Sequence, residues 1–176
     1  TNERTNERTN ERTNEHTQLC FRYIDDLLLI NNDDQMMKAM TESYPKELVL
    51  VPDDTDGKSC PFLDLQVTIK DDCISTSIYD KRDTFDFPIV NFPTLSGNIS
   101  KKSSYVFFTG ELVPYARAYT YYEDFKQRTL PLVSKLKTQF FKSMLLKNTW
   151  IKFCNSHILL IQKYGPKVMF LYDEWM

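Results

Sequence analysis

Two adjacent aspartates, set between two apolar runs, determine how the first ordered part of this chain folds. The residues Leu19-Cys20-Phe21 come before Tyr23-Ile24-Asp25-Asp26, and Leu27-Leu28-Leu29-Ile30 comes after. An apolar stretch on each side of a short acidic break is typical of a β-hairpin with buried strands. We therefore predict a hairpin over residues 19–30 that carries both carboxylates at its turn.

Carboxylates at a hairpin turn are suited to binding a divalent cation. Mg²⁺ prefers oxygen ligands and usually binds through one or two carboxylates together with substrate phosphates. Two such ions can clamp the attacking and leaving oxygens of a phosphoryl transfer. Asp25 and Asp26 are therefore candidate catalytic residues and ligands for Mg²⁺ or Mn²⁺. Three other Asp-Asp pairs occur in the chain, but they are explained by a helix N-cap or by turns.

The chain begins with a low-complexity segment, for which we set the bounds 1–18. Thr-Asn-Glu-Arg repeats with a period of four, ends in Thr13-Asn14-Glu15-His16 and contains no apolar residue. We expect coil or a frayed helix there, because nothing in the repeat can be buried. The repeat does not have the layout of a signal peptide, and no later stretch reaches the roughly 18 apolar residues of a membrane span. These patterns predict an intracellular protein, nuclear or cytoplasmic, that does not bind membranes.

The net charge of −2 conceals a strong asymmetry along the chain. Residues 17–100 carry fifteen acids and seven bases, whereas residues 101–176 carry five acids and twelve bases. No acid interrupts the nine Lys and Arg residues from Lys126 to Lys167. A basic half beside a carboxylate hairpin suits a surface that binds a nucleic-acid backbone. The alternative is an ordinary solvated helix face.

The four cysteines do not have the spacing of zinc ligands. We expect Cys20, Cys60, Cys73 and Cys154 to be buried, reduced thiols without disulfide bonds, as in a reducing compartment.

The pattern between residues 31 and 103 predicts one helix, further strands and an irregular connection. A helix should run from the N-cap Asp33 to about Ser43, followed by a short strand over residues 48–51. Alternation from Leu63 to Ile69 predicts a second hairpin over residues 62–79 with one buried face. Prolines and aromatic residues then indicate a connection without regular structure.

Three helices are predicted in the rest of the chain. The first covers about 104–120, with Pro114 as a kink or boundary. The second begins near Leu130, and the third covers 149–164. The second is defined by apolar residues spaced three and four apart and by two lysines on the opposite face: Val133, Leu136, Phe140 and Met144, and Lys135 and Lys142. The order of these elements predicts an α+β fold, in which hairpins and a helix precede a helical bundle.

Several segments resemble the reverse transcriptases of Penelope-like retroelements: FRYIDDLLLINN, FLDLQVTI with ISTSIYDKRD, FPIVNFP-x-LSGNIS, and the basic helical tail. The resemblance covers roughly residues 19–165. It implies a right-hand polymerase, with a partial palm over 19–84, a connection over 85–103 and a thumb-like helical subdomain over 104–176. A protein of this family is an RNA-directed DNA polymerase that binds an RNA template and a DNA primer.

The resemblance also implies roles for individual residues. Asp25 would ligate a metal directly, and Asp26 would support the metal or the primer end. Tyr23 would pack near the primer terminus or the incoming nucleotide. The hairpin over residues 62–79 would steady the primer 3′ end.

Contacts with nucleic acid are expected in the helical half. Arg117 matches an arginine in the helical region of the family. Lys135 and Lys142 are selected by their positive charge, because a thumb needs cations against the phosphates.

The chain departs from the family upstream of the hairpin. Palm polymerases need a further metal-binding aspartate and fingers, but residues 1–18 contain glutamates and no aspartate. We therefore expect no polymerase activity from this chain alone, because phosphoryl transfer depends on positioning and charge neutralisation. The endonuclease domain of many family members would also lie outside the chain. Two other functions remain open: a non-catalytic nucleic-acid-binding module, and a non-functional translated remnant of a retroelement.

Overall fold

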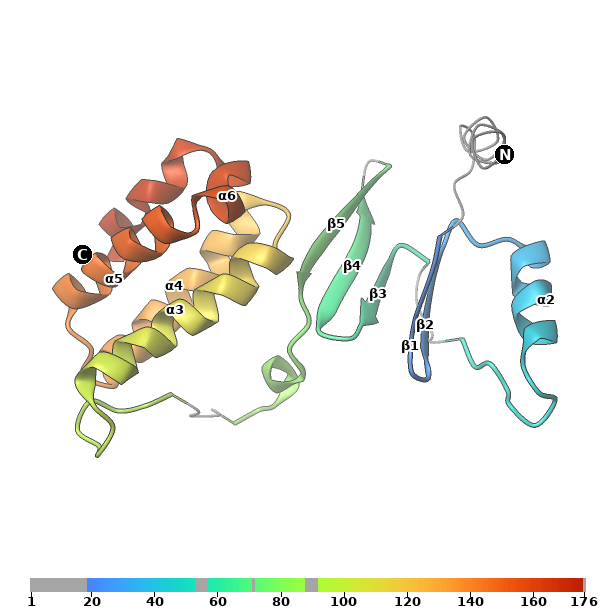
Figure 1. Ribbon diagram of the computed structural model, residues 1–176, viewed down its shortest axis with the longest axis horizontal. Helices are drawn as coiled ribbons and strands as arrows, with labels where there is room; N and C mark the ends of the chain where they lie inside the picture. The colour runs from blue at the N-terminus through green and yellow to red at the C-terminus, as the bar shows by residue number, and fades with distance from the viewer. Residues whose placement is uncertain (1–18, 53–56, 71, 88–91, 176) are drawn as a thin grey trace, which may run out of the picture. The chain divides into compact units, whose positions relative to one another are not determined.

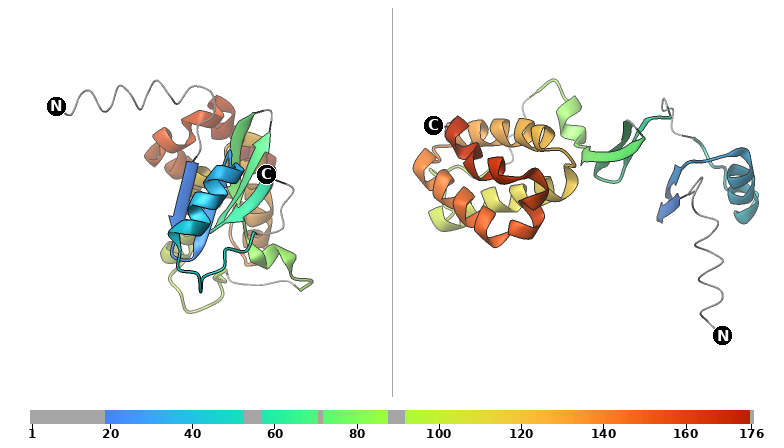
Figure 2. Two further views of the ribbon diagram at one scale, coloured as in Figure 1. Left: turned by 90° about the vertical axis from the view of Figure 1, so that its right-hand side faces the viewer. Right: turned by 90° about the horizontal axis from the view of Figure 1, so that it is seen from above.

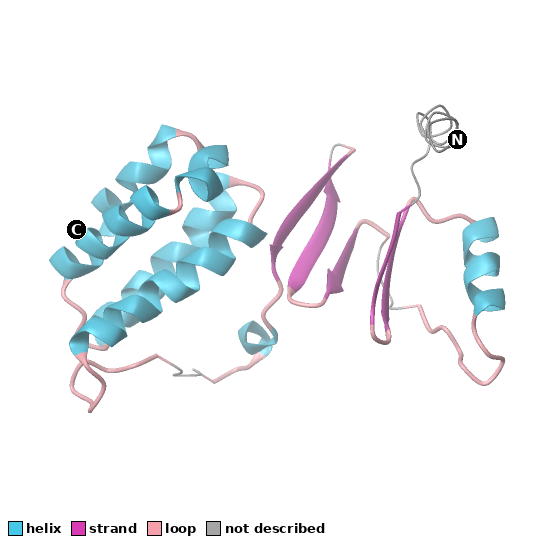
Figure 3. Cartoon of the chain, in the orientation of Figure 1, coloured by secondary structure: helices cyan, strands magenta, loops and turns pink. Residues whose placement is uncertain are grey.

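The protein is α+β, with two small antiparallel sheets and a set of helices, shown as a computed structural model in Figures 1 and 3. The structure describes residues 19–52, 57–70, 72–87 and 92–175. They belong to two units, one within residues 1–56 and the other within residues 57–176. The coil or frayed helix predicted for the repeat lies outside the described residues.

The first unit contains the predicted hairpin and helix. Strands β1 (Leu19–Tyr23) and β2 (Asp26–Ile30) pair antiparallel, and α2 (Asp34–Ser43) follows. Helix α2 begins where the sequence predicted, because the Asp33 carboxylate accepts a hydrogen bond of 2.7 Å from the Met36 amide. The hairpin and the helix are both confirmed.

Burial in the first unit is lower than predicted. Strand β1 is exposed along its whole length, and Ile30 is the buried apolar residue of β2. The strand predicted over residues 48–51 is wrong, since these residues form no strand and Leu48, Val49 and Val51 are exposed. The Leu48 amide donates to the Pro45 carbonyl at 2.9 Å, so the segment starts in a turn.

The second unit begins with a three-stranded antiparallel sheet in the order β3-β4-β5. The strands are β3 (Ser59–Phe62), β4 (Leu65–Lys70) and β5 (Cys73–Ile78). The predicted hairpin corresponds to β4 and β5, whereas β3 was not predicted. Pro61 is tolerated because β3 is an edge strand. Leu63 was assigned to the buried strand face, but it lies in the β3–β4 turn with a φ of +56°.

Residues 118–120, which follow the first long helix of this unit, form hydrogen bonds with the outer edge of β5. The Thr120 amide donates to the Thr76 carbonyl at 3.0 Å, and the Thr76 amide donates to Thr120 Oγ1 at 2.8 Å. The Thr76 hydroxyl also donates to the Ala118 carbonyl at 2.5 Å. One threonine therefore attaches the sheet to the bundle at three points.

The rest of the second unit is helical. Its elements are η1 (Lys81–Thr84), α3 (Lys101–Ala118), α4 (Tyr122–Thr138), α5 (Ser143–Ser156), α6 (Ile158–Ile161), η2 (Gln162–Tyr164) and η3 (Pro166–Trp175). Helices α3, α4 and α5 lie side by side, and η3 packs against α4 and α5 (Figures 1 and 2). None of the described helices is both long enough and apolar enough to cross a membrane.

Trp150 on α5 lies at the centre of the bundle core. Its indole is fully buried against the rings of Phe125, Phe153 and Trp175 at centroid distances of 6.2, 5.6 and 5.1 Å. The segment after residue 167, which has no clear hydrophobic period, supplies Trp175 to this core. Aromatic packing between distant segments therefore holds the bundle together.

The helix bounds differ from the prediction at several places. Pro114 lies inside α3 and ends no helix, and α4 begins at Tyr122, earlier than predicted. The predicted third helix is interrupted at His157, between α5 and α6. Since α4 ends at Thr138, the proposed apolar stripe stops at Leu136.

Phe140 and Met144 were expected to be buried, but their side chains are 69% and 58% exposed. They fall in the turn after α4 and in the first turn of α5, so the helical spacing no longer applies to them.

The cysteines are free thiols, but their burial varies. Cys154 is buried as predicted, and desolvation raises the pKa of its thiol to about 12. Cys20 and Cys73 are exposed, so the prediction of burial is wrong for them.

Candidate functional site

The turn between β1 and β2 presents the candidate metal ligands. Tyr23 pairs with Asp26 at the end of the ladder, which leaves Ile24 and Asp25 as a two-residue loop. Ile24 has a φ of +54°, as in the primed turns that close tight hairpins. A β-branched residue is rarely found in this left-handed region, so the turn is locally strained. Arg22 Nε donates to the Ile24 carbonyl at 3.1 Å and braces it.

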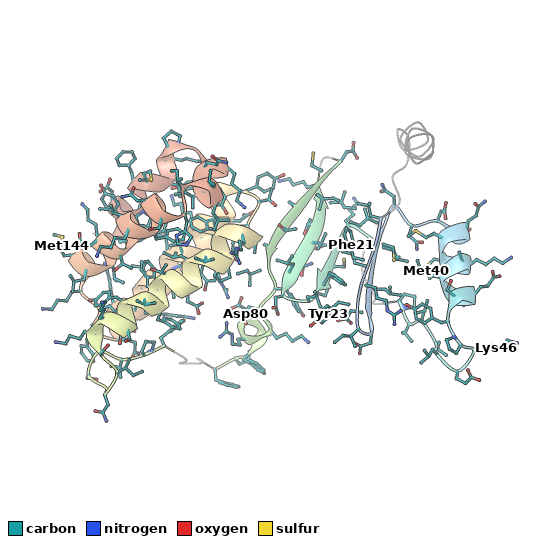
Figure 4. The ribbon with its side chains drawn as sticks, in the orientation of Figure 1. Phe21, Tyr23, Met40, Lys46, Asp80 and Met144 are labelled. Carbon is teal, nitrogen blue, oxygen red and sulfur yellow. The ribbon has the colours of Figure 1, made fainter. Side chains whose placement is uncertain are left out.

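The two faces of this hairpin have different surroundings. Because residues alternate along a strand, Phe21 and Tyr23 share one face, and cross-strand pairing adds Asp26 to it. In Figure 4, Phe21 and Tyr23 lie on the side of the hairpin away from α2, and Met40 lies on the side of α2 that faces the hairpin. Arg22, on the other face, lies with its guanidinium 5.2 Å from the centre of the Tyr44 ring.

The carboxylates stand in solvent at the turn, and the apolar strands beside them are less buried than expected. Asp25 and Asp26 are both exposed, and no ion pair to either is found within the described residues. Phe21 and Tyr23 on the same hairpin are 47% and 55% exposed. The hairpin tip is therefore open to a ligand approaching from solvent.

The donor chemistry of this tip fits a hard divalent cation in part. Two adjacent carboxylates supply the oxygen ligands that Mg²⁺ and Mn²⁺ prefer. Among the residues that the structure describes, no group of three or more His, Cys, Asp and Glu side chains is placed to hold a metal ion. Asp25 and Asp26 would therefore hold a cation that also takes oxygens from phosphate and water.

The predicted nucleic-acid residues lie at two ends of the bundle. Lys135 is on α4 and Lys142 is the N-cap of α5. The prediction that these two lysines share one helix face is therefore wrong. Both are exposed near the end where α4 stops and α5 starts. Arg117 is in the last turn of α3, at the opposite end, and its carbonyl accepts a hydrogen bond of 3.5 Å from Lys163 Nζ.

We call the first of these ends the lysine end. It is formed where α3 begins, α4 stops and α5 begins (Figure 1). The Lys142 amide donates to the Tyr105 hydroxyl at 2.9 Å, and the Leu95 amide donates to the Gln139 carbonyl at 3.2 Å. Its exposed lysines are Lys101, Lys102, Lys135 and Lys142.

The segments that form the lysine end contain no acid of their own, although Lys135 also lines the pocket that contains Asp86 and Glu111. Residues 92–110 and 129–147 include no Asp or Glu. Lys135 is an exposed residue, and its Nζ lies 5.9 Å from the centre of the Phe92 ring. A phosphate backbone is the kind of ligand that such a surface attracts.

A second charged cluster, which the sequence did not single out as a site, joins η1 to α4. Arg128 on α4 donates to the carboxylates of Asp80 and Asp83 at 2.8 and 2.5 Å. Arg82 also binds Asp80, with two contacts of 2.7 and 2.8 Å. Two arginines therefore clamp Asp80, which is labelled in Figure 4, at the end of the second hairpin.

The cluster shifts the pKa values of its members. The hydrogen bonds from Arg82, with the charge of Arg128, lower the pKa of Asp80 to about 2. Burial and the nearby Glu111 carboxylate raise the pKa of the Tyr115 hydroxyl to about 12. At neutral pH the aspartate is charged and the tyrosine is neutral.

The clamp lies in the wall of a pocket of about 450 Å³ between η1, the following loop, α3 and α4. Its arginines already bind the two aspartates, so we interpret them as structural residues that fix the second hairpin on the bundle. The run Asp80-Lys81-Arg82-Asp83 was the available sequence signal. Its partner Arg128 lies 48 residues after Asp80 along the chain, and no local sequence pattern indicated that the two would be in contact.

Comparisons of the chain with protein families, with curated proteins and with solved structures find no match.

Proposed function

We propose that this chain is the palm-and-thumb portion of an RNA-directed DNA polymerase of a retroelement, similar to the Penelope-like reverse transcriptases that its sequence resembles. The observation that carries the proposal is the first hairpin turn. It displays Asp25 at its tip and Asp26 on the adjacent strand, with both carboxylates exposed.

The surroundings of the turn support a role in phosphoryl transfer. A bound Mg²⁺ or Mn²⁺ would neutralise phosphate charge. Asp25 and Asp26 would provide its protein oxygens, and the braced turn would fix their position. Tyr23 pairs with Asp26 on the same face, so its exposed ring can pack against a sugar or base beside the phosphate.

The second unit supports a role in holding a template–primer duplex. Its sheet is fixed to the bundle through Thr76 and through the Asp80–Arg128 clamp. The lysine end offers cations without neighbouring acids in its own segments. Phosphate contacts of this kind position a duplex without reading its sequence.

A metal titration tests the carboxylate turn directly. Mn²⁺ broadens the NMR signals of nuclei close to it, and we expect the amides of residues 23–26 to broaden first. Asp25→Asn should abolish this effect, because an amide is a poorer ligand for Mn²⁺ than a carboxylate. Asp34→Asn, in the exposed first turn of α2, is the matched control and should leave it unchanged. Broadening that is equal in all three proteins would refute metal binding at the turn.

A primer-extension assay tests the expectation that this chain does not polymerise alone. We expect no template-dependent DNA synthesis on an RNA template with Mg²⁺ or Mn²⁺, because the carboxylates of the turn are only part of a two-metal clamp. Synthesis that is lost in Asp25→Asn would show that the described carboxylates are sufficient.

The lysine end also favours a second candidate function, a nucleic-acid-binding module without catalysis. Such a module should bind an RNA–DNA duplex with a steep salt dependence, need no Mg²⁺ and be insensitive to Asp25→Asn. The exposed apolar face of β1 favours the third possibility, a non-functional remnant. Aggregation that rises with concentration, together with a non-cooperative melt, would support it.

A further inference from the structure

We infer that Phe140 is a stacking platform for an unpaired base of single-stranded nucleic acid, within the lysine end. The inference deepens the binding half of the proposed function and rests on it. It does not depend on the carboxylate turn.

The backbone at Phe140 has a conformation that favours glycine. Helix α4 ends in a Schellman motif, in which the Phe141 amide donates to the Leu136 carbonyl and the Phe140 amide to the Lys137 carbonyl, both at 3.1 Å. The motif requires a left-handed residue at its centre, and Phe140 fills it with a φ of +68°. A side chain at this position costs about 1 kcal/mol relative to glycine.

Core packing does not explain the large side chain either. The neighbouring Phe141 is 4% exposed and packs edge-on against Tyr105, with ring centroids 4.9 Å apart. Phe140 is 69% exposed. Phe141 is buried and anchors the turn. Phe140 has its ring in solvent, at a backbone conformation that favours glycine. A single exposed apolar residue is ordinary, but one retained at a glycine position indicates a role outside folding.

The positive charges near the Phe140 ring indicate which kind of ligand it would bind. The lysine end is formed by segments without acids, and Lys142 lies two residues after Phe140 at the positive end of α5. An exposed ring among cations is the combination that binds single strands, because each base has a face to stack and each nucleotide has a phosphate. A paired base offers no free face, so the platform should distinguish a single strand from a blunt duplex.

The test measures binding of the full chain to a labelled oligothymidylate and to a blunt RNA–DNA duplex by fluorescence anisotropy. Phe140→Gly removes the ring and installs the residue that the backbone favours. We expect its melting temperature to be equal to or above that of the parent chain. Its Kd for the single strand should rise about tenfold, the order expected for loss of one base–aromatic stack. Its Kd for the duplex should change less than twofold.

Two variants sharpen the comparison. Phe140→Trp keeps an aromatic face, so it should retain single-strand affinity and show a change in indole fluorescence when the oligonucleotide is added. Phe170→Ala removes an exposed phenylalanine of η3, where the acids Asp173 and Glu174 follow, and should leave both affinities unchanged.

The outcomes separate this inference from the proposed function. Unchanged single-strand affinity in Phe140→Gly, with normal binding by the parent chain, would overturn the platform and leave the nucleic-acid proposal intact. A folded parent chain that binds neither oligonucleotide would overturn both. Binding to phosphatidylserine vesicles that Phe140→Gly abolishes, without an effect on nucleic acid, would overturn the platform in favour of a membrane contact.

Discussion

The helical bundle and the first hairpin are both rich in apolar residues, but they use them differently. The bundle buries Trp150, Phe125 and Phe153 completely or nearly so. The hairpin leaves Phe21 and Tyr23 about half exposed on the face that also carries Asp26. The helical bundle therefore contributes most of the buried core, whereas the first hairpin presents the candidate metal ligands. Substitutions in the two regions should have effects of very different size on stability.

The largest difference should appear on truncating one aromatic residue in each region. Trp150→Ala removes the centre of the core and should lower the free energy of unfolding by about 3–5 kcal/mol. Phe21→Ala removes a half-exposed side chain and should lower it by less than about 1 kcal/mol. Denaturant titrations followed by circular dichroism measure both. Equal losses would show that the hairpin face is covered in solution.

A smaller loss should follow from breaking the clamp between η1 and α4. Arg128→Met keeps much of the side-chain volume but leaves the largely buried Asp80 with one arginine. We expect a loss of about 1–3 kcal/mol, the range for hydrogen bonds to charged groups. Lys126→Met on the same helix, which loses an ion pair to the exposed Glu174, is the control and should lose under about 1 kcal/mol. Similar losses in the two variants would contradict the structural role of the clamp.

The same clamp predicts a dependence of stability on pH. The pKa of Asp80 is lowered in the folded protein, from 3.8 to about 2. Its stabilising effect should therefore be complete above pH about 4 and should disappear as the pH falls towards 2. Asp80→Asn should be less stable than the parent chain at neutral pH, and the difference should shrink over this window. A difference that stays constant between about pH 5 and about pH 2 would exclude the clamp as its source.

The attachment of the sheet to the bundle should contribute somewhat less. Thr76→Val keeps the shape of the side chain and removes its hydroxyl hydrogen bond to the Ala118 carbonyl. We expect a loss of about 1 kcal/mol in the free energy of unfolding. Amide hydrogen exchange should be faster at Thr120, whose amide donates to the Thr76 carbonyl. Thr68→Val, within the same sheet, is the control that should leave exchange at Thr120 unchanged.

Local signals in the sequence were sufficient for the first hairpin and for α2. The acidic break between apolar runs located the turn, and the Asp33 cap located the start of the helix. The left-handed conformation of Ile24 could not be predicted, because glycine and asparagine are the usual signals for such a turn. The exposure of the strands beside Asp25 and Asp26 was missed, since an apolar sequence does not reveal which faces are covered.

Tertiary contacts decided the features that the sequence concealed. The end of α4 has no glycine, so the apolar spacing was extended too far, to Phe140 and Met144. Strand β3 is held by its pairing with β4 despite Pro61. Trp175 enters the core from a segment without a clear period, through contacts with distant helices. Each of these depends on residues far apart in the sequence.

The smallest expected effect tests whether the first hairpin holds its turn against local preference. Ile24→Gly relieves a left-handed β-branched residue and should slow amide exchange in β1 and β2, by an amount equivalent to about 0.5–1 kcal/mol. Leu63→Gly, at a φ of +56° in the other sheet, should have the same local effect there and none on the first hairpin. Faster exchange in Ile24→Gly would mean that the isoleucine side chain stabilises the turn through contacts. Slower exchange would mean that the chain keeps a bulky residue beside Asp25 at the expense of stability, as Phe140 does at the lysine end.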